Sequence, residues 1–249
     1  MIKAALKKLL PKKIHAILSR FYLKAVVLPK IKKQFEGKST KEVMTTIYTN
    51  KLWGSLEGSD FNSGSGSHNS TVINPYIEQV KKFLNSTPEK LKVCDFGCGD
   101  FNVGSNLVSS TSMYIACDIV EPLIERNKKE FQAHNLEFKC LDLVTDPLPD
   151  ADCAIIRQVL QHLSNDEIKI ILKKLQKYKY LIITEHLPYG EFTANQDKKT
   201  GPDIRIYHNS GIVLTEAPFN LRTLLTKELV SVDDGQNSGC IVTNLYALS

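Results

Sequence analysis

The strongest chemical signal in the sequence is the segment of residues 93–100, VCDFGCGD. Gly97 and Gly99 would let the backbone approach a ligand closely, and the beginning of a following helix offers free N–H groups. A dinucleotide fingerprint needs a third glycine three residues after Gly99, but Asn102 stands there. The carboxylate of Asp95 suits a ligand with a cationic ammonium group in place of a pyrophosphate. The pattern therefore predicts a nucleoside-like ligand that carries an ammonium group.

Two further acids stand where the next two predicted strands end. Asp118 could accept hydrogen bonds from ribose hydroxyls, and Asp142 could accept one from an adenine amino group. Either carboxylate taken alone could equally cap a helix. In order after the glycines, with Ile119 and Leu143 beside them, they predict S-adenosylmethionine as the cofactor, because this molecule has an ammonium group at its methionine end.

The elements that must position these residues follow from the apolar pattern. From residue 91 onward, short apolar runs alternate with helical periodicity, which predicts a parallel sheet with helices on both faces. A polar stretch at 233–239 predicts a terminal hairpin, so one closing strand must be antiparallel. We therefore expect an α/β fold with a doubly wound, mostly parallel seven-stranded sheet, an antiparallel C-terminal hairpin strand and an N-terminal helical extension. The predicted strands are 91–96, 113–118, 136–141, 152–157, 180–184, 221–232 and 240–248, and the predicted helices are 74–84, 102–109, 122–134 and 166–178, the last capped by Ser164 or Asn165.

The chain is expected to have two parts. Residues 1–70 are predicted to form a basic helical extension with a Gly/Ser-rich segment, and residues 71–249 the α/β domain with a lid at about 188–210. The tract Ser63–Ser67 has the composition of a flexible linker. Closure of this tract over the methionine end of the cofactor is the alternative.

Charge is distributed unevenly along the chain. Residues 1–35 contain ten Lys or Arg and no acid, whereas the whole chain has a net charge of +5, so the remainder is acidic. Large apolar residues recur in this basic segment at helical spacing, interrupted by Pro11 and Pro29. Two interpretations stay open: packing on the α/β domain or on a second subunit, or binding to an anionic membrane face. Nucleic acid is not expected as a partner, because the remainder of the chain has the wrong charge.

The cysteine spacing does not predict a stabilising metal site, and the apolar stretches do not predict a membrane span. The six cysteines are scattered and form no Cys-x-x-Cys pair, so we expect no disulfide framework and no zinc site. No acidic cluster predicts a catalytic magnesium ion. Lysines interrupt each apolar stretch near the N-terminus, which argues against a signal peptide and a transmembrane helix. The predicted location is the cytoplasm, at the inner face of the membrane if the basic segment binds there.

Four motifs resemble those of class I S-adenosylmethionine-dependent methyltransferases of the Rossmann type: VCDFGCG, ACD, LD and IIRQVLQHL at 93–99, 116–118, 141–142 and 155–163. The resemblance covers about residues 91–187. It implies that the first motif lines the methionine end of the cofactor, that Asp118 holds the ribose and that Asp142 lies by the adenine. It also implies that Arg157 and Gln158 lie near the transferable methyl group.

Several flanking segments are similar to those of bacterial methyltransferases associated with surface-glycan clusters: the tract Ser63–Ser67, EHLP at 185–188, residues 195–205 and PFNL at 218–221. This similarity implies a sugar hydroxyl as the acceptor. Such a hydroxyl is a weak nucleophile at neutral pH and would benefit from a general base. His186, directly after the fifth predicted strand, is the first candidate, and His162 is the second. Packing beneath the cofactor is the alternative role for His162, and proton loss to water without a base is the alternative mechanism. His68 has no supporting neighbour in the sequence.

The predicted lid contains further candidates for acceptor binding. Arg205 has a planar fork suited to a phosphate or carboxylate of the acceptor, and Asp203 and His208 are additional candidates beside it. A solvated loop is the alternative for this region. The predicted activity is thus O-methylation of a sugar hydroxyl of a bacterial surface glycan or its precursor. Two alternatives remain: a small-molecule O- or carboxyl-methyltransferase, and a non-catalytic S-adenosylmethionine-binding scaffold recruited to a membrane by the basic segment.

Overall fold

The computed structural model describes residues 28–54, 61–235 and 239–248. The chain divides into two compact units, residues 1–38 and residues 39–249. Of the first unit, the structure describes helix α3 (Leu28–Gln34) and the residues that follow it; the rest of the predicted basic segment lies outside the described residues. The division between the units lies at Lys38–Ser39, so the described residues 39–54 and 61–70 belong to the second unit.

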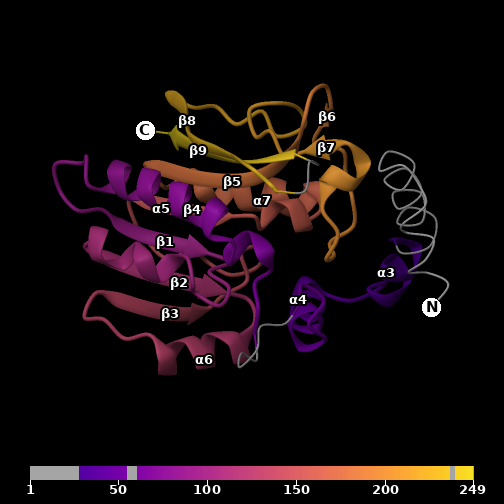
Figure 1. The fold of residues 1–249 in the computed structure, drawn as a ribbon, viewed down its shortest axis with the longest axis horizontal. Helices are drawn as coiled ribbons and strands as arrows, with labels where there is room; N and C mark the ends of the chain where they lie inside the picture. The colour runs from indigo at the N-terminus through magenta and orange to yellow at the C-terminus, as the bar shows by residue number, and fades with distance from the viewer. Residues whose placement is uncertain (1–27, 55–60, 236–238, 249) are drawn as a thin grey trace. The chain divides into compact units, whose positions relative to one another are not determined.

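The second unit is built on a seven-stranded sheet with the order β3-β2-β1-β4-β5-β9-β8 (Figure 1). Strand β9 runs antiparallel to both β5 and β8, whereas the other neighbouring strands are parallel. The predicted fold class is confirmed, including the antiparallel hairpin at the C-terminus. The strands are β1 (Lys92–Phe96), β2 (Met113–Asp118), β3 (Leu136–Cys140), β4 (Cys153–Arg157), β5 (Tyr180–Pro188), β8 (Leu225–Asp233) and β9 (Gly239–Ala247).

Three helices of this unit begin at a residue whose side chain caps them, whereas the helix that follows Val120 has no side-chain cap. Ser39 and Ser164 each form a capping box, with Glu42 at the start of α4 (Thr40–Thr49) and Glu167 at the start of α7 (Asn165–Leu175). The predicted cap at Ser164 is confirmed. Helix α5 (Ser70–Leu84) begins earlier than predicted because the side chain of Asn69 accepts a hydrogen bond from the amide of Thr71. Helix α6 (Glu121–Glu130) is shorter than predicted.

The helix predicted at 102–109 was wrong. Two short 3-10 turns, η3 (Gly104–Asn106) and η4 (Val108–Ser110), occupy this region. The side chains of Ser105 and Asn106 both donate to the carbonyl of Asn102. Small polar side chains of this kind bind the local backbone and compete with the helical pattern.

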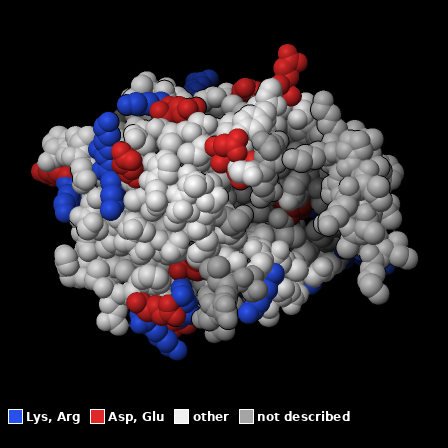
Figure 2. Space-filling view, viewed as in Figure 1, with Lys and Arg blue, Asp and Glu red and all other residues white. Residues whose placement is uncertain are grey.

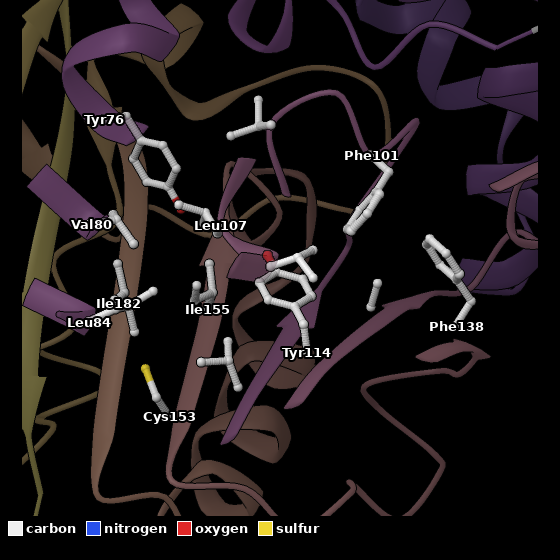
Figure 3. Packing of buried hydrophobic residues seen from close by; sticks show 14 of the residues in the cluster. Tyr76, Val80, Leu84, Phe101, Leu107, Tyr114, Phe138, Cys153, Ile155 and Ile182 are labelled. Atoms are coloured by element: carbon white, nitrogen blue, oxygen red, sulfur yellow. The ribbon is translucent and has the colours of Figure 1, made fainter. Parts of the chain in front are cut away.

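The main hydrophobic core lies between α5 and one face of the sheet (Figure 3). Val80 and Leu84 of α5 are fully buried and lie beside Ile155 and Ile182 of the central strands. An aromatic cluster extends the core toward β3, with the ring of Phe101 at 4.9 Å from Phe138, 5.1 Å from Phe131 and 5.8 Å from Tyr114. This packing fixes the segment after β1 against the sheet.

The region predicted as a lid at 188–210 has an ordered hydrogen-bonded structure. It contains strand β6 (Thr193–Ala194), the turn η6 (Arg205–His208) and strand β7 (Ser210–Gly211), which pairs with β6. The buried side chain of Asn195 donates to the carbonyls of Val213 (2.8 Å) and Ala217 (3.0 Å) and accepts from the amide of Val213 (2.8 Å). The region is therefore a layer fixed to the domain, and a solvated loop does not describe it.

Charged side chains of both signs are interspersed on the face of the molecule shown in Figure 2. Within the described residues, no helix is long and apolar enough to cross a membrane.

Candidate functional site

A cavity of about 570 Å³ opens at the carboxyl ends of the parallel strands. Ligands of open α/β sheets bind at this edge, because the loops that follow parallel strands meet there. Most of the residues that the sequence predicts for the site line this cavity: Asp95, Gly97, Gly99, Asp118, Ile119, Asp142, Leu143, Arg157, Gln158, His162 and His186. The three predicted acceptor-binding residues Asp203, Arg205 and His208 do not line it.

The loop after β1 needs glycine at two positions. Gly97 and Gly99 have φ angles of 77° and 57°, a backbone region that other residues adopt at a cost. A Cβ atom on Gly97 would collide with Val159, and one on Gly99 would collide with Ser63. Both positions therefore require glycine because neighbouring segments pack tightly against them, and the close approach to a ligand stays a prediction.

Asp95 ends β1 as a buried carboxylate that accepts a hydrogen bond from the hydroxyl of Tyr114 at 2.8 Å. Burial raises the pKa of Asp95 to about 7, although this hydrogen bond and the guanidinium of Arg157 oppose the rise. Arg157 is half-buried and lies over the ring of Tyr76, 5.0 Å from its centroid. A ligand cation placed beside this buried carboxylate would lower its pKa and so favour its anionic form.

Asp118 is held at the tip of β2 by the loop after β1. Its carboxylate accepts hydrogen bonds from the amides of Gly99 (3.1 Å) and Val120 (3.0 Å). Burial nevertheless raises the pKa of Asp118 to about 6. Asp142, at the corresponding place after β3, accepts from the amide of Val144 at 2.7 Å. Each carboxylate thus accepts a hydrogen bond within its own turn and also borders the cavity, and neither is the N-cap of a helix.

Residues 61–69, called here the Ser-Gly strap, lie along the loop after β1. The amide of Ser63 donates to the carboxylate of Asp100, and the amide of Asp100 donates to the hydroxyl of Ser63, both at 2.8 Å. His68 contacts the same carboxylate through Nε2 at 2.7 Å. Asn102 donates to the carbonyl of Ser67 at 2.7 Å. The linker interpretation of this tract is therefore wrong for the described structure, because the tract closes one side of the cavity.

Arg157 fastens the strap from the opposite side. Its guanidinium donates to the carbonyl of Gly66 at 2.6 Å and to the hydroxyl of Ser67 at 3.3 Å. Its Nε atom is buried and has no hydrogen-bond partner among the described residues. The residue therefore connects the tip of β4 with the strap, a role that its position in the sequence does not indicate.

His186, the first candidate for the general base, forms a pair with the carboxylate of Asp234. The Nε2 atom of His186 lies 3.0 Å from a carboxylate oxygen of Asp234, and both side chains line the cavity. Burial lowers the pKa of His186, while the anionic Asp234 opposes that shift. The lowered pKa favours the neutral ring, and a neutral ring that donates from Nε2 to the carboxylate has Nδ1 as its basic nitrogen.

His162 has a different environment. Its ring stacks at a tilt on Trp53, with centroids 5.0 Å apart, and its Nδ1 lies 3.2 Å from the carbonyl of Gly201. Burial lowers the pKa of His162 to about 3, with Lys198 adding to the effect. A nitrogen of such low basicity is a poor proton acceptor, so this geometry favours the packing role over the role of base.

The structure corrects the predicted role of the lid residues. Arg205 is 1% exposed, and its guanidinium donates to the carbonyls of Gln161 (3.3 Å) and Leu163 (2.9 Å) and to Oδ1 of Asn165 (2.6 Å). It fixes the segment after β4 and cannot grip an acceptor. Asp203 forms an ion pair with Lys198 at 3.4 Å, and His208 is an exposed residue of η6. The residues of this region that line the cavity are instead Pro202, Ile204, Ile206 and Tyr207.

Sequence reasoning missed Tyr48, Trp53, Asp100 and Asp234 of the cavity wall, and it missed His68, which contacts Asp100. Tyr48 comes from α4, where its hydroxyl lies 3.1 Å from that of Ser63. The only local signal for these residues was the placement of Asp100 directly after the glycine motif and of Asp234 in a turn. Their partners lie 15 to 48 residues away along the chain, so local patterns did not indicate the pairings.

Residues 93–178 match the family model of a methyltransferase domain. No curated protein sequence is significantly similar to the chain. Magnesium protoporphyrin IX methyltransferase from Synechocystis PCC 6803, solved with S-adenosylmethionine, has a TM-score of 0.54 at 15% identity over 85% of this chain and 99% of that chain. The fold is that of class I methyltransferases.

Two further structures have the same class I fold. The N-methyltransferase NodS from Bradyrhizobium japonicum WM9, in complex with S-adenosylhomocysteine, has a TM-score of 0.52 at 10% identity over 73% of this chain and 89% of that chain. Human N-acetylserotonin methyltransferase, with S-adenosylmethionine, has a TM-score of 0.54 at 16% identity over 91% of this chain and 68% of that chain. The predicted cofactor agrees with the ligands of these structures. Their names point to different acceptors, so the likeness supports the fold and the cofactor and leaves the acceptor to the residues of this chain.

No group of three or more His, Cys, Asp or Glu within residues 28–54, 61–235 and 239–248 is arranged to hold a metal ion.

Proposed function

We propose that this protein is an S-adenosylmethionine-dependent O-methyltransferase in which His186, oriented by Asp234, is the general base. The observation that carries the proposal is that the His186–Asp234 pair lines the same cavity as the loop of Gly97 and Gly99. A base and a cofactor-binding loop on one cavity are the two parts that methylation of a hydroxyl requires.

The cofactor half of the cavity fits S-adenosylmethionine in size and charge. Its volume of about 570 Å³ lies within the range of small-molecule sites. Burial raises the pKa values of Asp95 and Asp118, so a cation of the ligand beside them would favour their anionic forms. The cofactor supplies an electrophilic methyl group on a sulfonium. Asp95 would bind its ammonium end, Asp118 its ribose, and Asp142 with Leu143 its adenine.

The base half can remove a proton from a hydroxyl held at the cavity wall. The lowered pKa of His186 favours its neutral ring, and Asp234 would stabilise the imidazolium that forms when the ring takes up that proton. A histidine with a carboxylate behind it is a common arrangement for this task, because the carboxylate also fixes the orientation of the ring.

The charge of the cavity favours an uncharged acceptor. Of the described residues that line it, five are aspartates and Arg157 is the single Lys or Arg. The guanidinium of Arg157 is already bound to the Ser-Gly strap. A carboxylate or phosphate on the acceptor would therefore be placed among anions without a cation to bind it. This argues against carboxyl methylation, one of the alternatives inferred from the sequence.

A sugar hydroxyl of a bacterial surface glycan or its precursor is the acceptor that we propose. The support is the similarity of the flanking segments to glycan-cluster methyltransferases, together with the wall formed by Trp53, Ile204 and Tyr207. A wall that combines aromatic and apolar side chains with a few polar groups is typical of sites for small organic ligands.

The test is methyl transfer from radiolabelled S-adenosylmethionine to glycan precursors separated by anion exchange into neutral and anionic pools. We expect label in the neutral pool, and label in the anionic pool would contradict the charge argument. Isothermal titration with S-adenosylhomocysteine is the companion measurement. Binding without transfer to either pool would favour the non-catalytic scaffold, and absence of binding would refute the proposed function as a whole.

A second proposal concerns the basic segment of residues 1–35, which we propose recruits the enzyme to anionic membranes. Its support is sequence-based: ten Lys or Arg, no acid, and large apolar residues at helical spacing. Flotation with vesicles that contain phosphatidylglycerol should carry the full chain upward, and vesicles of phosphatidylcholine alone should not. Replacement of Lys3, Lys7 and Lys8 by Gln should reduce flotation, whereas equal flotation with both vesicle types would contradict electrostatic recruitment.

A further inference from the structure

Lys174 makes an unusual set of contacts on the side of the domain where β3 ends. Its ammonium donates to the backbone carbonyls of Leu143 (3.0 Å), Val144 (2.6 Å) and Asp146 (2.8 Å). A lysine ammonium has three protons and no acceptor, so these three bonds use its full capacity. The residue is half-buried in the last turn of α7. All three of these hydrogen bonds of Lys174 are therefore made to the backbone of one segment, residues 143–146.

That segment, residues 141–148, is called here the β3 loop, and its first residues line the cavity. Leu141, Asp142, Leu143 and Val144 all belong to the cavity wall. The loop also has internal bonds: the amide of Asp142 donates to the carboxylate of Asp146, and the amide of Asp146 donates to the carbonyl of Asp142, both at 2.9 Å. These bonds alone leave three carbonyl oxygens directed at one point. The positive charge of Lys174 offsets their mutual repulsion.

We propose that Lys174 is a positioning residue for the cofactor, which acts by holding the β3 loop in the conformation that presents Asp142 and Leu143 to the adenine end. The inference rests on the proposed function. The inference gives α7 an effect on cofactor affinity, although no residue of this helix lines the cavity. Lys174 touches neither cofactor nor acceptor in this account and acts through the backbone that it binds.

The experiment measures S-adenosylhomocysteine affinity by isothermal titration for Lys174→Met, Lys174→Gln and the matched control Lys173→Met. Lys173 lies on the same turn of α7 but is exposed, and it makes none of these bonds. We expect the dissociation constant to rise about tenfold in Lys174→Met, to rise less in Lys174→Gln, and to stay within about twofold of the original in the control. An unchanged constant in both Lys174 variants would overturn the inference.

A double-mutant cycle separates positioning from general destabilisation. If Lys174 acts through the β3 loop, Asp142→Asn should weaken binding much less in the Lys174→Gln background than in the original chain, because the loop is already displaced. Additive effects would overturn the inference, even if both single variants bind more weakly. Addition of n-butylammonium to Lys174→Ala should restore part of the lost affinity, and lack of any recovery would also count against the inference. If the original chain fails to bind S-adenosylhomocysteine, the proposed function itself fails, which is a distinct outcome.

Discussion

The part of the cavity proposed to bind the cofactor, the cofactor half, and the part proposed to bind the acceptor, the acceptor half, are built in different ways. The cofactor half comes from residues that directly follow strands, among them Gly97, Asp118 and Asp142, and they lie at one edge of the sheet because the strands are parallel. The proposed acceptor half comes from dispersed segments: the end of α4, the Ser-Gly strap, residues Pro202, Ile204, Ile206 and Tyr207, and Asp234 with Gly235 after β8. The first half is a property of the fold, whereas the second depends on how insertions pack against it.

This difference explains why sequence patterns predict the residues of the cofactor half better than those of the acceptor half. In the cofactor half, the predicted residues line the cavity even where a side chain also accepts a hydrogen bond within its own turn, as Asp142 does from Val144. In the acceptor half, the residue with the most suitable chemistry for an anion, Arg205, is consumed by buried hydrogen bonds to the segment after β4. The chemical type of a residue indicates a function only when its side chain is free to face the ligand.

The sharpest test of the comparison is His186→Ala, which should affect the acceptor half alone. Loss of the base should lower kcat by about 10²–10⁴-fold. The dissociation constant for S-adenosylhomocysteine should not change, since the cofactor residues are on other strand tips. Steady-state kinetics and isothermal titration measure the two quantities. His208→Ala, an exposed residue outside the cavity, is the control and should retain full activity. Near-normal turnover in His186→Ala would shift the mechanism to proton loss without a base.

Arg205→Met tests whether this arginine is structural. Three buried acceptors would lose their donor, so the free energy of unfolding should fall by about 3 kcal/mol. Chemical denaturation measures this change, and Lys199→Met, at an exposed position of the same region, is the control. If Arg205 instead bound the acceptor, the variant would keep its stability and lose activity through a raised KM.

Asp118→Ala tests the cofactor half. Loss of hydrogen bonds to the ribose should weaken S-adenosylhomocysteine binding by about 1–3 kcal/mol, the range for hydrogen bonds to a charged group. The turnover of enzyme saturated with cofactor should change much less. Asp203→Ala is the matched control, because its carboxylate pairs with Lys198 outside the cavity. Equal affinity in Asp118→Ala and the original chain would remove this residue from the site.

The pH dependence of binding gives the smallest expected effect. The pKa of Asp95 is about 7 in the cofactor-free protein, and its anionic form is the one that attracts an ammonium group. Affinity for S-adenosylhomocysteine should therefore fall as the pH is lowered from about 8 to about 6, by at most about tenfold per pH unit below the pKa. Asp95→Asn should bind more weakly and show a flatter pH profile in the same titrations. A flat profile in the original chain would place the ammonium end elsewhere.

The same shift sets the sign of a stability effect. Because burial raises the pKa of Asp95 from 3.8 to about 7, the folded protein binds more protons than the unfolded chain between these values. The contribution of this group to stability is therefore present at low pH and is lost as the pH rises through 7. Thermal unfolding of the original chain and of Asp95→Asn at several pH values would show this difference.

The sequence by itself determined the order of the seven sheet strands and of helices α5, α6 and α7, the cap at Ser164 and the placement of the predicted carboxylates and glycines at strand ends beside the cavity. These features depend on apolar periodicity, on capping residues and on the position of a residue relative to a strand end, all of which involve near neighbours in the chain. The short 3-10 turns after Gly99 escaped prediction because small polar side chains there bind the backbone in a way that periodicity does not register.

Only the tertiary structure decided which side chains meet across the cavity. It paired His186 with Asp234, placed His162 against Trp53, buried Arg205 and fastened the Ser-Gly strap to Asp100. The physical reason is that the cost of burying a polar group depends on the partners that packing brings to it from distant segments. Local sequence patterns contain the chemical types of those partners and no information on their distances.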